Sequence, residues 1–255
     1  MSLSWLDRLT LFIHPQRVVL ERQPWRGARS RQLSEVAPPA AGEADWQPVL
    51  AVAETLLRST GKGASLHIVV ADHLVRYALL PWSEMLTGQS ARLDMARALF
   101  RNALGERAAT LDIALDRPVF GKSGVAAGID RQLLDGLRAA AKARRLRLNS
   151  VQPRLVAELA AQQKQLNDGW LACLDLGWLT LAGIRDGEIA SLRNHRASTA
   201  EPDIQAGELA GLLAAESATV NGKKVLISTS AGAAPALAGG WETTLVAPVA
   251  GGAHA

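Results

Sequence analysis

The run Gly121-Lys122-Ser123 is the stretch of the sequence that comes nearest to a phosphate-binding loop. A P-loop needs a further glycine five positions before its Gly-Lys pair, and a helix whose N-terminus faces the phosphate must follow. Asp116 stands at the earlier position, and Gly124 to Ala127 reads as a strand. We therefore predict a turn at Gly121-Lys122-Ser123 and not a nucleotide site.

The histidines and the cysteine do not form a metal-binding pattern. No two histidines have the spacing of ligands on one helix face, and Cys173 is the single cysteine, which excludes an intramolecular disulfide and a cysteine-rich metal site. Cys173 lies in an apolar run and is expected to be buried. We predict no metal and no cofactor. The five histidines are His14, His67, His73, His195 and His254.

The sequence contains no recognisable nucleophile either. A Gly-x-Ser-x-Gly elbow is absent, and no base adjoins Cys173 in the sequence. Asp112 and Asp116 can act as an acid and base pair only if the fold brings them together, and otherwise they are surface charges. The residues alone therefore predict no catalytic site.

Alternating strands and helices indicate an α/β fold. Leu9 to Ile13 and Arg17 to Glu21 form a predicted hairpin around Pro15. Further strands are expected at Ser30 to Val36, Leu66 to Ala71, Leu74 to Leu80, Leu111 to Leu115, Val125 to Ile129 and Leu146 to Val151. Helices are expected at Trp46 to Leu57, Gln89 to Leu104, Asp130 to Ala141 with Asp130 as N-cap, and Pro153 to Gln165.

A second lobe is expected after Asn167-Asp168-Gly169. Its predicted strands are Trp170 to Leu176, Leu179 to Ile184, Ile189 to Arg193, Lys224 to Ser228 and Thr243 to Val246, with a helix at Asp203 to Glu216 and a short helix or turn through Pro235. We expect a first lobe over 1–166, with an inserted α/β subdomain at about 64–116, a reduced second lobe over 167–248 and a disordered tail over 249–255.

Composition sets the class of partner. The chain has 255 residues, 48% of them hydrophobic, so it can bury a core, and 28 basic against 24 acidic residues give a net charge of +4. One Tyr and three Phe offer little for stacking on bases, which disfavours nucleic-acid binding. The start of the chain does not look like a secretion signal, and no uncharged apolar segment reaches the ~18 residues of a spanning helix. We expect a cytoplasmic protein, which still allows it to sit at the inner membrane through a partner.

The order of three segments resembles the actin-like ATPase fold, specifically the platform proteins of bacterial type IV pilus assembly and type II secretion (PilM-like proteins and the cytoplasmic lobe of GspL). Leu9 to Glu21 resembles the first hairpin of that family. Gly124 to Leu148 resembles its central strand-helix-strand unit, and Trp170 to Ile189 resembles the strand pair that opens the second lobe. The resemblance implies a two-lobed actin-like (ribonuclease H-like) fold.

The nucleotide elements depart from the family pattern. Phe12 and His14 occupy hairpin positions where the resemblance implies an Asp and a Gly near the phosphates. The second phosphate loop keeps Asp175, Gly177 and Thr180, but Trp178 and Leu179 replace small residues. The segment Thr229-Ser230-Ala231, which resembles the adenosine-side glycine run, has no glycine. We expect that ATP is not hydrolysed and that ATP and Mg²⁺ do not serve as cofactors, because phosphoryl transfer depends on charge neutralisation and positioning.

The resemblance implies a scaffold that captures a cytoplasmic segment of an inner-membrane partner in a groove of the first lobe. Tyr77, Leu79, Leu80, Pro81 and Trp82 are candidates for lining it, although the same residues also fit a core strand that ends in a turn. The alternative is an active actin-like or sugar-kinase-like ATPase, with Asp175 organising the metal and with Gly177 and Thr180 at the phosphates. A third possibility is a cytoplasmic regulator unrelated to secretion, which shares the scaffold fold and differs only in its partner. The sequence leaves the partner's identity and the oligomeric state open.

Overall fold

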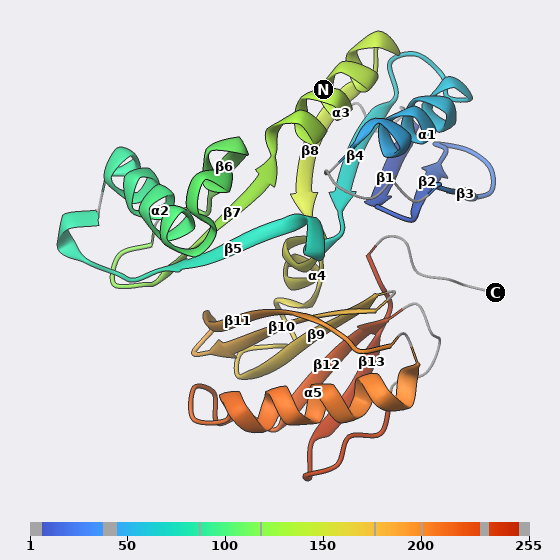
Figure 1. Cartoon of the computed structure of the whole chain (residues 1–255). Coiled ribbons are helices and arrows are strands. Elements are labelled where there is room, and N and C mark those ends of the chain that lie inside the picture. The colour runs from blue at the N-terminus through green and yellow to red at the C-terminus, as the bar shows by residue number, and fades with distance from the viewer. Residues whose placement is uncertain are drawn as a thin grey trace. The chain divides into compact units, whose positions relative to one another are not determined.

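The chain divides into two compact units in the computed structural model, which describes residues 7–37, 45–86, 88–117, 119–175, 177–199, 201–229 and 235–249. Unit 1 comprises 1–75, 110–112 and 129–154, and unit 2 comprises 76–109, 113–128 and 155–255. Each unit has its own sheets and helices (Figure 1).

Unit 1 is built on a mixed sheet of five strands. Their order is β3-β2-β1-β4-β8. The strands are β1 (Arg8–His14), β2 (Arg17–Gln23), β3 (Ser30–Glu35), β4 (Ser65–Val70) and β8 (Arg147–Pro153). The first three form an antiparallel meander, whereas β4 pairs parallel with both β1 and β8. The predicted hairpin around Pro15 is confirmed.

Two helices of unit 1, α1 (Gln47–Arg58) and α3 (Arg131–Ala143), pack against each other and against the sheet (Figure 1). The side chain of Asp130 caps α3, as predicted, by accepting hydrogen bonds from the N–H groups of Gln132 and Leu133. Gly136 allows the close approach of the helices, because a Cβ there would lie 2.4 Å from a methyl of Leu50. The apolar faces of these helices and of β1 and β4 form the core of unit 1.

Most of a three-stranded sheet, in the order β5-β7-β6, belongs to unit 2. These strands are β5 (Val75–Leu80), β6 (Leu111–Leu115) and β7 (Gly124–Asp130). Helix α2 (Gln89–Leu104) and the 3-10 turns η2 (Glu84–Leu86) and η3 (Gly105–Thr110) lie between β5 and β6 in the sequence. A third 3-10 turn, η1 (Asp72–Leu74), lies in unit 1 directly before β5, and the sequence predicts none of the three turns.

The rest of unit 2 is a second five-stranded sheet in the order β11-β10-β9-β12-β13, with α4 (Arg154–Gln162) and α5 (Pro202–Glu216). The strands are β9 (Gly169–Asp175), β10 (Trp178–Arg185), β11 (Glu188–Arg196), β12 (Lys224–Thr229) and β13 (Glu242–Val246). β9 is buried along its whole length, because side chains that alternate between its two faces enter two separate clusters. Trp170 and Leu174 pack with Leu209 of α5, whereas Cys173 packs with Leu155 of α4.

The division of the chain differs from the expected one in its boundaries. The sequence predicts an inserted subdomain at about 64–116, but β4 lies inside the sheet of unit 1, between β1 and β8. The segment apart from unit 1 therefore begins after Val75 and extends through most of β7, with the exception of 110–112. It groups with the second lobe in unit 2, as does α4 after Arg154, which we had assigned to the first lobe. Of the expected tail, residues 250–255 lie outside the described residues.

Candidate functional site

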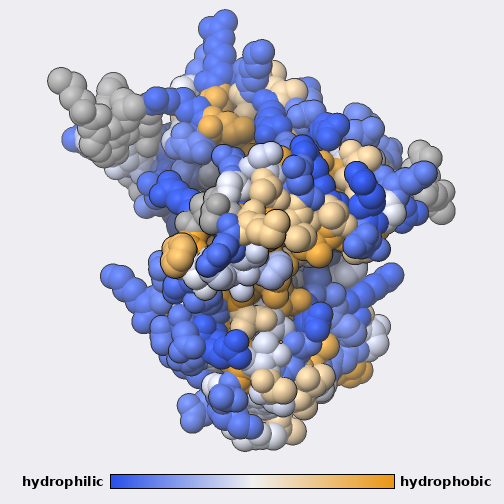
Figure 2. Space-filling view, turned by 90° about the vertical axis from the view of Figure 1, so that its left-hand side faces the viewer, coloured by the Kyte–Doolittle hydropathy of each residue, from blue (hydrophilic) through white to orange (hydrophobic). Residues whose placement is uncertain are grey.

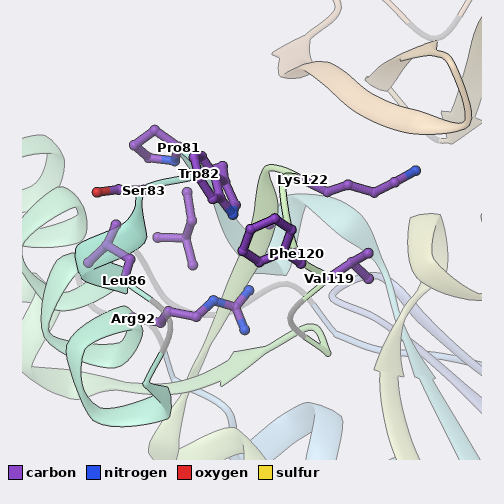
Figure 3. A pocket seen from close by; sticks show the side chains of 10 residues that line it. Pro81, Trp82, Ser83, Leu86, Arg92, Val119, Phe120 and Lys122 are labelled. Atoms are coloured by element: carbon purple, nitrogen blue, oxygen red, sulfur yellow. The ribbon is translucent and has the colours of Figure 1, made fainter.

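A pocket of about 180 Å³ opens beside the end of β5 in unit 2 (Figure 3). Side chains from three segments line it: the end of β5 with η2, the start of α2, and the turn before β7. The lining residues are Leu80, Pro81, Trp82, Ser83, Leu86, Arg92, Val119, Phe120, Lys122 and Gly124. An engineered cavity of roughly 150 Å³ holds a benzene molecule, so this pocket has room for one large apolar side chain but not for a nucleotide.

Trp82 and Phe120 form the aromatic wall of the pocket (Figure 3). Their rings meet edge to face with centroids 5.5 Å apart, the arrangement that aromatic quadrupoles favour. Phe120 is nevertheless 83% exposed, and Met85 in η2 is 86% exposed. Apolar side chains gather across the middle of the face shown in Figure 2. Exposed large apolar residues of this kind that cluster around a pocket mark a surface for contact with another molecule.

A buried arginine forms the floor of the pocket. The side chain of Arg92 is 7% exposed, and its guanidinium donates to the carboxylate and to the backbone oxygen of Asp116. Asp116 accepts a further hydrogen bond, from the N–H of Val125. The charge of Arg92 is therefore already paired, and the recognition surface that remains is mainly apolar.

Gly121-Lys122-Ser123 forms a turn, as predicted. The N–H of Lys122 bonds to the backbone oxygen of Val119, and Gly121 takes a positive φ of 77° that suits glycine. The Lys122 ammonium lies 3.4 Å from a carboxylate oxygen of Glu188 at the start of β11. The turn thus presents Val119 and Phe120 to the pocket, which no pattern in the sequence had indicated.

The structure separates the five residues proposed for a partner groove. Leu80, Pro81 and Trp82 line the pocket. Tyr77 packs instead against the apolar cluster around Leu155, and Leu79 is absent from the lining. Strand β5 therefore contributes Tyr77 to the core, while its C-terminal end lines the pocket. Binding of a partner by any of these residues stays a prediction.

The hairpin that would face a phosphate is filled by its own side chains. Phe12 is 1% exposed in the core of unit 1, and His14, 2% exposed, faces Arg17 across the turn. The Nδ1 of His14 accepts the N–H of Gln16 at 3.1 Å, so this turn amide is already engaged. Backbone N–H groups are the usual phosphate donors at such a loop, and the imidazole occupies one of them.

His14 is also held uncharged. Burial, and then the positive charges of Arg17 and Arg154, lower the pKa of His14 to about 3. Its ring meets the ring of His73 edge to face, with centroids 4.6 Å apart. The imidazole is therefore a neutral, packed part of unit 1 at physiological pH.

Asp175, Gly177 and Thr180 lie together at the hairpin between β9 and β10 in unit 2. Asp175 is buried at the end of β9, opposite Trp178, and Gly177 takes a positive φ of 79° in the turn. The Thr180 hydroxyl donates to the side-chain oxygen of Asn194 on β11 at 3.0 Å. The Asp175 carboxylate and the tight turn at Gly177 are thus retained, while the Thr180 hydroxyl forms a hydrogen bond between two strands of the sheet.

The same unit contains a buried carboxylate that the sequence analysis missed. Glu158 on α4 is fully buried and accepts hydrogen bonds from the Ser228 hydroxyl at 2.8 Å and from the N–H of Val249 at 3.0 Å. It therefore joins α4 to β12 and to the chain after β13. The proposed adenosine segment begins at Thr229, at the end of β12, but residues 230–234 lie outside the described residues.

Among the solved structures that resemble this chain, two match it over most of its length. The cytoplasmic domain of EpsL, an inner membrane component of the type II secretion system of Vibrio cholerae, matches with a TM-score of 0.60 and 14% identity, covering 94% of this chain and 89% of that one. A Bacteroides thetaiotaomicron protein with an actin-like ATPase fold matches with a TM-score of 0.59 and 10% identity, covering 88% and 82%. The chain has an actin-like ATPase fold. This confirms the fold expected from the order of motifs.

The sequence itself gives no closer relationship, because no family model matches it and the comparison with curated proteins finds no match. Among the described residues of this actin-like fold, no group of three His, Cys, Asp or Glu side chains is placed to hold a metal ion. Within the same residues, no helix combines the length and the apolar character needed to cross a bilayer.

Proposed function

We propose that this protein is a cytoplasmic scaffold of an inner-membrane platform of the pilus-assembly or type II secretion kind, and that it works without ATP hydrolysis. The observation that carries the proposal is the pocket walled by Trp82 and Phe120, an apolar site with exposed rims on a fold that resembles the cytoplasmic domain of EpsL. The occupant is a short cytoplasmic segment of a membrane protein.

The pocket determines what such a segment must present. One large apolar side chain, Leu, Phe or Trp, fills the pocket against the wall that Trp82 and Phe120 form, and flanking apolar residues cover Met85 and Val119. Such an anchor in a desolvated pocket carries most of the binding energy of a peptide interface. Because Arg92 and Lys122 already have carboxylate partners, the segment needs no acidic anchor.

The nucleotide side of the fold supports a lapsed site. The Gln16 amide is engaged by His14, and the Thr180 hydroxyl is engaged by Asn194. The half-buried indole of Trp178 stands next to Gly177, where a small residue would let backbone amides approach a phosphate. Loss of these donors removes the positioning on which phosphoryl transfer depends.

Peptide binding tests the proposal. Labelled synthetic peptides that cover the cytoplasmic segments of inner-membrane proteins encoded beside this chain are titrated with the protein, and fluorescence anisotropy is measured. We expect one peptide to bind, and Trp82→Ala to weaken its affinity by about tenfold or more. Trp25→Ala removes an indole that is 53% exposed outside the pocket, and it should leave the affinity unchanged. Unchanged affinity in both Trp82→Ala and Phe120→Ala would overturn the assignment of the pocket.

The second candidate function is an active ATPase that uses Asp175. It is favoured by the retained carboxylate at the end of β9 and the turn at Gly177. An active ATPase must bind ATP with Mg²⁺, and Asp175→Ala should abolish that binding. The scaffold function does not require ATP binding.

A further inference from the structure

Basic residues gather at one end of the five-stranded sheet in unit 1. The registers place Arg22 opposite Ser30, Arg8 opposite Gln23 and Ser65, and Ser65 opposite Arg147. The end of β2 and the starts of β1, β3, β4 and β8 therefore lie side by side at the same end of the sheet. Neighbouring strands lie about 4.8 Å apart, so this end of the five-stranded sheet is about 19 Å wide.

Three loops connect to the strands at this end of the sheet. The loop 24–29 joins β2 to β3, the loop 59–64 joins α1 to β4, and the residues 144–146 join α3 to β8. Backbone hydrogen bonds tie the last two loops together, from the N–H of Gly63 to the oxygen of Arg145 at 3.0 Å and from the N–H of Arg147 to the oxygen of Ala64 at 2.9 Å. Asp7 links the first loop to them, because its carboxylate accepts the N–H of Trp25 at 3.3 Å and its backbone oxygen accepts the N–H of Ser65 at 3.0 Å. The three loops therefore form a connected surface.

Six exposed basic residues on this surface are here called the basic end. They are Arg8, Arg26, Arg29, Lys62, Arg145 and Arg147. None of the six forms an ion pair with a carboxylate among the residues that the structure describes, in contrast to the neighbouring Arg22, which pairs with Asp7. Unit 1 has 15 Lys and Arg against 10 Asp and Glu, while unit 2 has 13 against 14, so the positive charge of the chain belongs to unit 1.

An exposed tryptophan lies within the basic end. Trp25, in the loop between β2 and β3, is 53% exposed, and the guanidinium carbon of Arg26 lies 4.3 Å from the centre of its ring. The amphipathic indole is enriched where proteins meet the headgroup region of a bilayer, with an apolar body and a polar N–H. A tryptophan among arginines that form no ion pair with a carboxylate of the described residues thus matches a surface that is anionic and partly apolar.

We propose that the basic end binds the anionic phospholipid headgroups of a membrane surface directly. Each Lys or Arg near an anionic bilayer contributes attraction, and six on one edge supply several such contacts together. A nucleic acid is the less suitable partner, because a single exposed Trp gives no series of stacking platforms. The inference goes beyond the proposed scaffold role and does not depend on it, since it concerns unit 1 and requires no peptide.

Vesicle sedimentation tests the inference with the full chain. Vesicles of phosphatidylcholine, with and without phosphatidylglycerol, are mixed with the protein at low and at high salt. We expect co-sedimentation only with phosphatidylglycerol, and its loss at about 1 M salt, where the screening length falls to about 3 Å. Neutralising Arg26, Arg29, Lys62 and Arg147 to Gln should weaken partitioning by about fivefold for each charge removed.

The controls separate charge at this end from charge in general. Arg101, Arg117, Lys164 and Arg196 are exposed in unit 2, and changing these four to Gln removes the same charge but should preserve sedimentation. Changing Arg26, Arg29 and Arg147 to Lys should also preserve it, whereas Trp25→Ala should weaken it. Equal loss in the two Gln variants, or no sedimentation of the wild-type protein, would overturn the inference. The inference would also be overturned if the protein bound a DNA duplex or single-stranded RNA more tightly than the vesicles at equal phosphate concentration, and if the variant with Arg26, Arg29, Lys62 and Arg147 changed to Gln lost that binding.

Discussion

The guanidinium of Arg92 on α2 lies against Asp116 in the loop before β7, with Nη2 2.5 Å from a carboxylate oxygen and Nη1 3.0 Å from the backbone oxygen. Asp116 in turn holds the N–H of Val125 at 2.9 Å. This contact joins the floor of the pocket to the strand that follows its aromatic turn. The position of Phe120 therefore depends on a polar network beneath it.

Asp116→Ala should lower the free energy of unfolding by about 2 kcal/mol, because it leaves the charge of Arg92 in a buried site without its carboxylate. Urea denaturation measures the loss. Asp94→Ala is the matched control, since Asp94 pairs with Arg97 at 3.1 Å on an exposed helix face and should cost less than about 0.5 kcal/mol. Equal losses in the two variants would show that the pair of Arg92 and Asp116 does not stabilise the pocket.

Two helical glycines should respond to alanine with opposite signs. A Cβ at Gly136 would lie 2.4 Å from Cδ1 of Leu50, so Gly136→Ala should separate α1 from α3 and lower the unfolding free energy by about 1–3 kcal/mol. Nothing lies within 4 Å of a Cβ at Gly211 in α5, so Gly211→Ala should raise it by about 1 kcal/mol through helix propensity. Thermal denaturation of both variants checks the signs, and stabilisation by Gly136→Ala would contradict the close packing of the helices.

His14 should make stability fall in acid. Its pKa is lowered to about 3 in the folded protein, first by burial and then by Arg17 and Arg154, against 6.5 in the unfolded chain. The contribution to stability is therefore complete above about pH 6.5 and is lost progressively as the pH falls toward 3. Between about pH 7 and pH 5, the unfolding free energy should drop by about 2 kcal/mol more in the wild-type protein than in His14→Gln. Identical pH profiles of the two proteins would exclude this role.

Local patterns in the sequence account for most of the fold. The hairpin of β1 and β2 follows from two apolar runs around Pro15, and α3 follows from an apolar stripe behind the N-cap Asp130. The boundary of the inserted segment could not be predicted in this way, because the place of β4 between β1 and β8 is a matter of strand pairing and not of local sequence.

The candidate sites were predictable only in part, for the same reason. Leu80 and Trp82 stand at the end of a recognisable strand, but Phe120 reaches the pocket from a turn about forty residues later, and only tertiary structure brings the two segments together. The hydroxyl of Thr180 is engaged by Asn194 on the next strand, a partner set by the register of β10 and β11. The basic end likewise depends on strand register, which a net charge of +4 does not reveal.

We infer that the actin-like fold is kept while its nucleotide site has lapsed. A calorimetric titration of the full chain with ATP and Mg²⁺ distinguishes this scaffold from an active ATPase. We predict no heat of binding at millimolar ATP, because the Gln16 amide and the Thr180 hydroxyl are already engaged. Binding at micromolar strength that disappears in Asp175→Ala would contradict the claim and would establish the ATPase alternative in its place.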